Sequence, residues 1–510
     1  MRPWPRPAPS GVIFGAVETR IFAEAAMRVL PSSSPVLFTL AAAALVTACS
    51  SPGPRYDLAR AALDELPDTQ LDVAPVHSAS HTGPWRVEEL LQLARRNNAT
   101  LLAETWRTRG AVFARDEAAA TILGPRLNAR AFNFRRSNLP RTEFTVGPIT
   151  TKAALGQKEF SQVEVTLQQR LLSLADQYYR IDAARLDAGA ARMQLERVRQ
   201  EVRRIVLGAI FDLLIQQDAL RSVEAVVENL ARREEETRRR YENGLAIEND
   251  VYKVQVERAN QAQAAFELRS AIRATRVRLA LLCGLDPESP LDIAWSRDVP
   301  DGAVAPRVGD AWRAAVKSRP DLHALSLSGE AFRRRGQAEW ADYLPAVDLQ
   351  SQYVWTDQSN LVEDDYFSLS LIAGIDLLDL SRHARIARFE AGEGEMAGRR
   401  LELERRIRGE IEVGCLSIAN ELSRLKFSSV AVKAGVEDVR VLKQRYDNGL
   451  STANDLLEAE VRLLNARVSR IQARYRYFQN LAELDAIVGA DGFAFRVEPP
   501  IGPPEPGAGK

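Results

Sequence analysis

The chain contains few of the residues from which disulfide scaffolds, metal centres and polyanion-binding surfaces are built. Its 510 residues include three cysteines and four histidines, and 68 basic side chains balance 68 acidic ones. A chain with no net charge gives no reason to expect a nucleic-acid partner. Cys283 and Cys415 lie far apart in apolar, helical sequence, which favours small core residues over a disulfide or a metal pair.

Signatures of catalysis are missing as well. The sequence contains no glycine-rich phosphate loop, no His-Glu-x-x-His, no Cys-x-x-Cys and no Gly-x-Ser-x-Gly. We therefore expect neither enzyme activity nor a cofactor or metal.

Long hydrophobic runs are a further absence, since none reaches the ~20 apolar residues that a membrane-spanning helix needs. The nearest candidate covers 35–48 and ends in Leu45-Val46-Thr47-Ala48-Cys49. This ending resembles a secretory signal followed by a lipobox, in which Cys49 becomes the acylated first residue of the mature chain. The alternative is a buried apolar helix that precedes an ordinary cysteine.

The residues around this segment fit the lipoprotein interpretation. Residues 1–26 are rich in proline and include Glu18 and Glu24, which do not suit a signal peptide, so we expect translation to start at Met27. Ser50 follows the cysteine, and a residue other than aspartate there is typical of bacterial lipoproteins of the outer membrane.

The rest of the chain contains an internal repeat around a short turn. The sequence Arg240-Tyr241-Glu242-Asn243-Gly244-Leu245 returns 205 residues later as Arg445-Tyr446-Asp447-Asn448-Gly449-Leu450. Asn-Gly readily adopts positive φ, so each copy is expected to end a long helix. Asp250 and Asp455 lie near the start of the helix that follows, and the correspondence predicts a tandem duplication.

Composition and repeat boundaries together divide the chain. The predicted parts are an upstream extension (1–26), a signal peptide (27–48), a lipid-anchored linker (49–84), a first repeat (85–285), a connecting segment (286–306), a second repeat (307–490) and a flexible tail rich in proline and glycine (491–510).

Each repeat contains two stretches in which apolar and polar residues alternate, which is typical of strands. The apolar positions are Leu127, Ala129, Ala131, Val163, Val165 and Leu167 in the first repeat, and Val347, Leu349, Tyr353, Trp355, Leu369, Leu371 and Ala373 in the second. We expect two hairpins, the first joined by a loop that contains glycine and proline. Four strands are too few for a membrane barrel, which needs about eight, so several chains would contribute. The alternative is a sheet whose apolar face packs on its own long helices.

The helices after the strands are predicted to be unusually long. Within a predicted helix over 178–240, a seven-residue apolar register runs from Ile181 to Arg233 with a second apolar seam beside it, which is typical of a helix with two neighbours. At 1.5 Å per residue this helix would be about 95 Å long. Helices with two apolar seams and a polar face can assemble into a hollow cylinder whose polar face lines water.

These features resemble the TolC-type outer-membrane efflux proteins, of the lipoprotein-anchored kind that serves tripartite pumps. The resemblance rests on Tyr-x-x-Gly-Leu, Asp six residues after the glycine and a long helix that closes at Gly284 or Gly489, twice per chain. It implies a mainly α protein with membrane β structure: a homotrimer with a 12-stranded β-barrel and a long periplasmic α-helical barrel.

The resemblance also implies roles for the turns after the long helices. In the family these turns form the periplasmic tip, where Gly-Leu contacts an adaptor protein, and here the corresponding pairs are Gly244-Leu245 and Gly449-Leu450. The family closes its tunnel with rings of acidic side chains, which fall on Asp455 and Glu458. From the sequence alone, an acidic residue at Asp250 or Asp455 is equally explained as helix N-terminal charge.

A tyrosine at the position of Tyr446 bonds an aspartate at the position of Asp250 in the family, and this helps to lock the closed tip. Ser451 occupies the position of an arginine that supplies a second lock in some members, so this chain lacks that lock.

The expected function is a passive exit duct in the cell outer membrane, anchored by lipid and extending into the periplasm. The implied partners are two further copies of the chain, a periplasmic adaptor, an inner-membrane transporter and outer-membrane lipid. Two alternatives remain at this stage: the outlet of a type I protein secretion system, and a periplasmic coiled-coil scaffold lipoprotein that forms no channel.

Overall fold

A computed structural model of the chain describes residues 83–139, 141–154, 157–172, 174–244, 246–357, 365–376, 378–490, 492 and 494. All of them belong to one compact unit, Thr69–Lys510. The predicted signal peptide and Cys49 lie outside the described residues.

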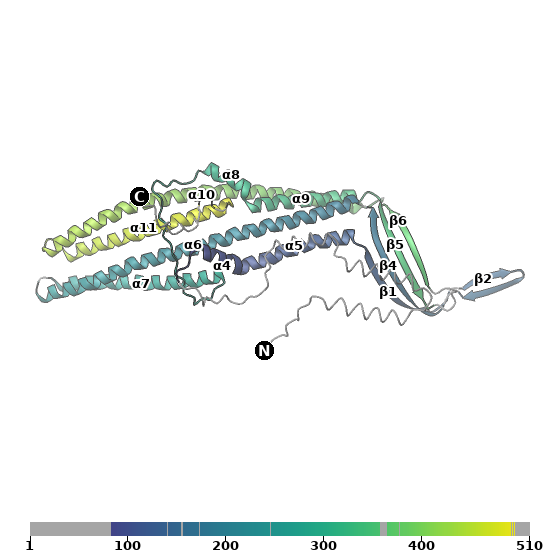
Figure 1. Cartoon of the computed structure of the whole chain (residues 1–510), viewed down its shortest axis with the longest axis horizontal. Helices are drawn as coiled ribbons and strands as arrows, with labels where there is room; N and C mark the ends of the chain where they lie inside the picture. The colour runs from purple at the N-terminus through teal and green to yellow at the C-terminus, as the bar shows by residue number, and fades with distance from the viewer. Residues whose placement is uncertain are drawn as a thin grey trace, which may run out of the picture. The chain divides into compact units, whose positions relative to one another are not determined.

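The described chain is mainly helical, and its two halves repeat the same order of elements (Figure 1). In the first half these are α4 (Val87–Asn97), α5 (Ala99–Leu123), strands, α6 (Leu174–Glu242) and α7 (Glu248–Cys283). In the second they are α8 (Val308–Ser318), α9 (Pro320–Ala341), strands, α10 (Leu380–Asp447) and α11 (Ala453–Val488). The predicted duplication and long helices are confirmed, and α6 and α10 are 69 and 68 residues long.

The helical run before the first strand is broken at Asn98, between α4 and α5. Asn98 ends α4 and caps α5, since its side-chain oxygen accepts hydrogen bonds from the backbone N–H of Thr100 (3.0 Å) and Leu101 (3.3 Å). Such a cap satisfies helix N–H groups that have no partner inside the helix. Pro320, at the start of α9, marks the equivalent break in the second repeat.

The four predicted strands form one antiparallel sheet in the order β1-β4-β5-β6. Its strands are β1 (Arg126–Arg135), β4 (Glu159–Leu172), β5 (Ala346–Thr356) and β6 (Asp365–Gly374). The pairing of β4 with β5 joins the two repeats directly, with Val165 opposite Tyr353. The predicted loop between β1 and β4 is wrong in part, because it contains a second hairpin of β2 (Arg141–Val146) and β3 (Ile149–Ala154).

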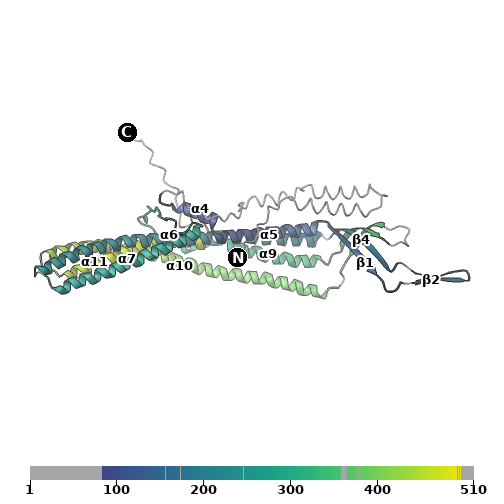
Figure 2. The same cartoon turned by 90° about the horizontal axis from the view of Figure 1, so that it is seen from below.

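The sheet keeps its apolar face uncovered. The predicted apolar positions fall on one face, since Leu127 pairs with Leu167 and Leu349 with Leu371. On this face Leu167 is 40% exposed and Leu371 67%, whereas Thr166 on the opposite face is 8% exposed. The long helices leave the end of the sheet and do not cover it (Figure 2). The alternative in which this face packs on the chain's own helices is therefore contradicted.

The largest core lies where the two repeats meet, around the middle of α6 and the C-terminal part of α11. Phe211, Trp295 and Phe478 pack their rings together there, and the centroid of the Trp295 ring lies 5.2 Å from that of Phe211 and 5.2 Å from that of Phe478. Trp295 belongs to the connecting segment, so this segment fastens both repeats to a common centre. Within the described ranges, no helix combines the length and the hydropathy needed to cross a bilayer.

Candidate functional site at the helix-hairpin tips

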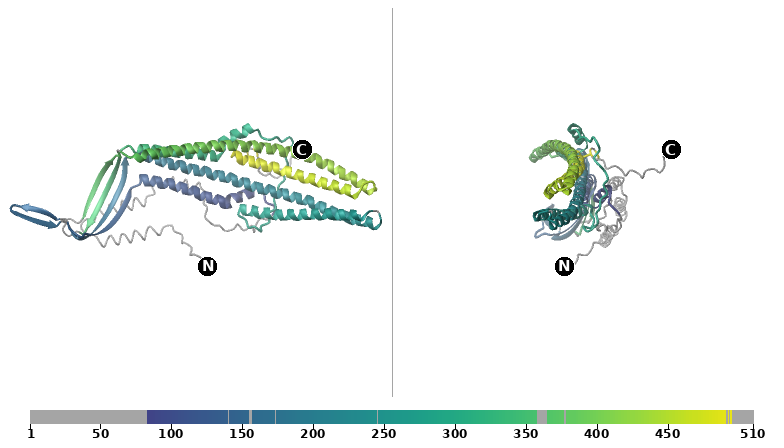
Figure 3. Two further views of the ribbon diagram at one scale, coloured as in Figure 1. Left: turned by 180° about the vertical axis from the view of Figure 1, so that it is seen from behind. Right: turned by 90° about the vertical axis from the view of Figure 1, so that its left-hand side faces the viewer.

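The two repeated turns form the tips of the α6–α7 and α10–α11 hairpins, at the end away from the sheet (Figure 3). Gly244 and Gly449 have φ values of 72° and 73°, which L-residues with a side chain rarely adopt. Each glycine N–H donates to the carbonyl of the preceding tyrosine, Tyr241 (2.9 Å) or Tyr446 (3.0 Å). The predicted role of Asn-Gly in ending the long helices is confirmed.

The second tip presents an apolar side chain to solvent. Leu450 is 77% exposed, although its N–H is fixed by a 2.7 Å hydrogen bond to the carbonyl of Arg445. In the first tip Leu245 lies outside the described residues, and Ile247 nearby is 62% exposed. Exposed apolar residues on a rigid turn are suited to contact another protein.

Asp455 takes part in the N-terminal cap of α11. Its carboxylate accepts hydrogen bonds from the Thr452 N–H (2.9 Å) and the Ser451 hydroxyl (3.0 Å), while the Thr452 side chain accepts from the Asp455 N–H (3.2 Å). This reciprocal arrangement is a capping box. The bonds from Thr452, and then that from Ser451, lower the pKa of Asp455. Asp455 therefore acts as an acidic residue at the start of a helix, which was the alternative given by the sequence. The expected role of Asp455 in an acidic ring that closes the tunnel remains a prediction.

Glu458 lies one turn further along α11 and is exposed. It accepts a 2.7 Å hydrogen bond from the Asn454 side-chain amide and lies 3.7 Å from the Arg462 guanidinium. Both contacts are on its own helix, and the expected role of Glu458 in a ring remains a prediction.

Tyr446 and Asp250 are not hydrogen-bonded to each other in the part of the chain that the structure describes. Asp250 lies 4.0 Å from the Lys253 ammonium on its own helix. Tyr446 is 7% exposed and packs with Ala453 and Leu456. The guanidinium of Arg240 lies 4.3 Å from the centre of the Tyr446 ring. No local sequence pattern predicts this contact, since Arg240 and Tyr446 come from different copies of the repeat.

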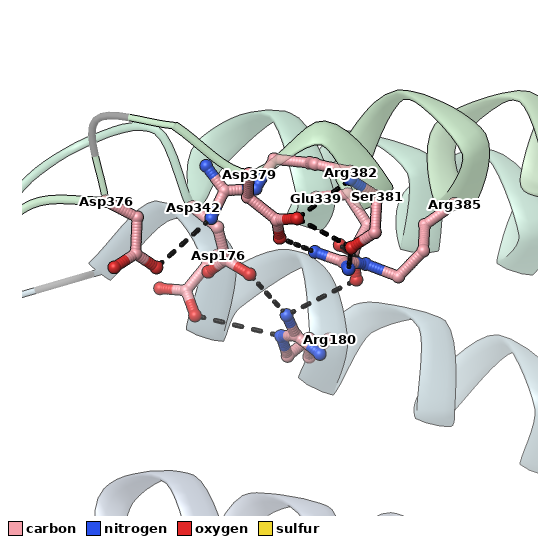
Figure 4. A network of polar contacts seen from close by, with 9 residues as sticks. All are labelled: Asp176, Arg180, Glu339, Asp342, Asp376, Asp379, Ser381, Arg382 and Arg385. Atoms are coloured by element: carbon pink, nitrogen blue, oxygen red, sulfur yellow. Dashed lines mark hydrogen bonds and ion pairs between the residues drawn. The ribbon is translucent and has the colours of Figure 1, made fainter.

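A second polar cluster lies at the other end of the long helices, where they meet the strands (Figure 4). Arg385 of α10 donates to Glu339 of α9 (2.7 Å) and to Asp379 (2.8 Å). Asp379 caps α10 by accepting from the N–H of Ser381 at 2.9 Å. Hydrogen bonds from Ser381 and Arg385 hold the pKa of Asp379 well below its usual range.

The cluster continues onto the first repeat through Arg180 of α6. Arg180 lies 2.7 Å from Asp342, 3.6 Å from Glu339 and 3.7 Å from Asp176, as Figure 4 shows. Burial, together with the nearby Asp176, raises the pKa of Asp342. The cluster therefore ties α6 to the end of α9 next to the sheet, a role that the sequence did not reveal.

Neither end of the helices carries the donor set of a metal centre, because the described residues contain no group of three or more His, Cys, Asp or Glu side chains able to hold a metal. The tips consist instead of rigid turns with exposed apolar and acidic side chains.

The class of protein follows from comparison with known proteins. Residues 312–490 match the profile of the outer membrane efflux protein family. The resemblance predicted from the sequence is therefore confirmed for the second repeat, which is similar to outer membrane efflux proteins. No curated protein matches the chain.

Solved outer-membrane channels share the fold over both repeats. The outer membrane protein VceC of Vibrio cholerae is 19% identical, with a TM-score of 0.66, and the match covers 79% of this chain and 96% of VceC. The channel OprN is 18% identical with a TM-score of 0.65, covering 83% and 97%. The open-state MtrE channel of Neisseria gonorrhoeae is 16% identical with a TM-score of 0.63, covering 79% and 89%. At these identities the matches establish the fold.

Proposed function

We propose that the chain forms the outer-membrane exit duct of a tripartite efflux system and conducts small solutes passively. The observation that carries this proposal is the four-stranded sheet, whose apolar face is not covered by the long helices, which extend from one end of the sheet. The family match of the second repeat supports the same function. Because β1 and β6 are the two edges of the sheet, a neighbouring copy can pair with each of them.

Three copies would supply twelve strands and bury every edge, which hydrocarbon requires of a sheet that spans it. The polar face would then line water, and the hairpins of the long helices would extend into the periplasm. In this arrangement the apolar residues exposed on β6, such as Leu369 and Leu371, face lipid. A homotrimer with a 12-stranded barrel is therefore part of the proposal.

The test is reconstitution of the purified full-length protein in planar lipid bilayers, combined with electron microscopy of the detergent-solubilised particle. We expect threefold particles and stepwise ion conductance. A monomeric particle that never conducts would contradict the proposal and leave the alternative of a periplasmic scaffold. Export of small solutes and of protein by a strain that lacks the gene would separate efflux from type I secretion.

The proposal includes a lipid anchor at Cys49. Radiolabelled palmitate should be incorporated into the wild-type protein and not into Cys49→Ala. Loss of label without loss of conductance would show that the anchor aids placement and is not needed for the pore. Label retained in Cys49→Ala would refute this site of acylation.

The proposal also assigns the tips to an adaptor protein and to the entrance of the duct. Gly244-Leu245 and Gly449-Leu450 would contact the adaptor, while three copies of Asp455 and of Glu458 would surround the entrance. Leu450→Asp should abolish cross-linking to the adaptor without affecting conductance, because Leu450 is exposed and makes no core contact. Asp455→Asn and Glu458→Gln should reduce cation selectivity, since a ring of carboxylates attracts cations.

A further inference from the structure

The two copies of the repeated turn use the same residues in opposite ways. In the first tip Tyr241 is 43% exposed, whereas its counterpart Tyr446 is 7% exposed. The arginines show the reverse, because the Arg240 side chain is 28% exposed while Arg445 is exposed. The difference arises from pairing between the tips: the arginine of the first turn lies against the tyrosine of the second.

Four contacts hold the Arg240 side chain. Its guanidinium lies 4.3 Å from the centre of the Tyr446 ring and donates to the Tyr446 carbonyl at 3.4 Å. It also lies 3.4 Å from Glu236 and 4.0 Å from Asp447. Three of these contacts are to the last turn of α10, so Arg240 of α6 links the two hairpins at their ends.

The apolar contacts between the hairpins stop before this point. The small core around Leu230 includes residues of α6, α7 and α11 and therefore holds both hairpins together. The apolar cluster nearest the second tip contains Tyr446, Ala453 and Leu456, which all belong to the α10–α11 hairpin. Beyond the Leu230 core, the hairpins are thus linked by polar and cation–π contacts, which are weaker and easier to reverse than a packed core.

A second polar link lies beside this core. Arg233 is seven residues before Arg240, so both side chains lie on one face of α6, about 10 Å apart along the helix. Arg233 forms a 2.9 Å ion pair with Glu460 of α11, and the side chains are 10% and 15% exposed. Among the described residues, Arg240 is therefore the arginine link between the hairpins that lies nearest the tips.

We propose that Arg240 is an internal latch that holds the α10–α11 tip against the α6–α7 tip of the same chain, and that breaking its contact with Tyr446 lets the tips separate. The inference rests on the proposed function in one respect, namely that the separated tips would widen the duct entrance. The latch uses the face of the tyrosine ring. The Tyr446 hydroxyl makes no hydrogen bond among the described residues, so it is not needed.

The first test measures the latch without reference to transport. Spin labels on Ile247→Cys and Leu450→Cys, one on each tip, report the distance between the tips by pulsed electron resonance. Labelled chains are diluted among unlabelled ones so that each measured pair lies in one chain. We expect Arg240→Ala and Tyr446→Leu to broaden and lengthen the distance distribution. Tyr446→Phe, which keeps the ring, should leave it unchanged.

Arg445→Ala is the matched control, because it removes the duplicate arginine, whose side chain is exposed. Arg240→Lys separates charge from stacking and should give an intermediate distribution. The latch is wrong if Arg240→Ala and Arg445→Ala give the same distribution, or if Tyr446→Phe opens the tips as far as Tyr446→Leu does. The second outcome would assign the lock to the hydroxyl.

Bilayer recordings of the same variants then test the consequence for the duct. Loss of one partly buried cation–π contact should raise the ratio of open to closed time about fivefold. Arg445→Ala and Tyr446→Phe should match the wild-type protein. If no variant conducts while the distances change as expected, the proposed duct fails and the latch stands. If the wild-type protein conducts and the distances do not change, the latch fails alone.

Discussion

The buried ion pair of Arg233 and Glu460 gives a prediction in which single and double substitutions have opposite effects. The Arg233 Nη2 and Glu460 Oε1 atoms are 2.9 Å apart. However, Arg233 Nε and Nη1 and Glu460 Oε2 are buried and lack a hydrogen-bond partner among the described residues. Burial raises the pKa of Glu460, although Arg233 opposes the shift. The pair is thus dehydrated and only partly satisfied.

Replacing one partner leaves the other charge buried and alone, which typically costs about 3–5 kcal/mol. We expect Arg233→Met and Glu460→Met each to destabilise the protein by about this amount. The double variant should be as stable as the wild-type protein, or more stable by about 1–4 kcal/mol, because no buried charge remains. The exposed pair Arg462–Asp438, 3.1 Å apart, is the control, and its removal should cost about 0–1 kcal/mol.

The assay is loss of helical circular dichroism on heating, at one protein concentration and one scan rate, because a membrane oligomer need not unfold reversibly. The expected order of midpoints has both single variants lowest and the double variant at or above the wild-type protein. A double variant as unstable as the sum of the single variants would refute the reasoning. In that case the pair would be a net source of stability.

Three further predictions concern the helix ends and the core. Gly284→Ala should destabilise the protein by about 2 kcal/mol or more, because the φ of Gly284 is +70° and an added Cβ would lie 2.5 Å from the Asn97 side chain. As a control, Gly409→Ala, in open space within a helix, should stabilise the protein by up to about 1 kcal/mol. Thermal unfolding measures both effects. Thr452→Ala should cost about 1 kcal/mol and speed amide exchange at the start of α11, while Ile247→Ala, at a helix start with no side-chain cap, should change exchange little. Cys283 should resist maleimide until the protein unfolds, because burial raises the pKa of its thiol to about 12; rapid labelling of the native protein would contradict this.

The sequence predicted the strands and the long helices well, because local patterns determine both. The apolar positions that alternate along β1 and β4 could face one way only in an antiparallel pair, and the register confirms this. The Asn-Gly turns fixed where α6 and α10 end. In contrast, β2 and β3 were missed because Gly147, Pro148 and several threonines lie in one short stretch, which was interpreted as a loop.

The contacts between the repeats could not be predicted in the same way. The β4–β5 pairing joins residues almost 200 positions apart, and no local pattern specifies it. The duplication implies the same surroundings for Tyr241 and Tyr446, but the two tyrosines differ in exposure. The two copies do not make reciprocal contacts at their tips, so one tyrosine is covered while the other stays exposed.

The capping bonds of Asp455 provide a test of the proposed ring of carboxylates at this position. In the single chain the capping bonds lower the pKa of Asp455 from its ordinary value of 3.8. The cap therefore stabilises the folded protein at pH values above 3.8, and this stabilisation is lost as the pH falls through the lowered pKa. Three carboxylates brought close together would act in the opposite direction, because like charges raise one another's pKa. The pKa of Asp455 in the assembled protein, measured by NMR of a carboxyl-labelled sample, therefore reports the width of the entrance. A value above the ordinary one indicates that the three tips have converged, and a value below it indicates that the cap alone acts on the carboxylate and the tips stand apart.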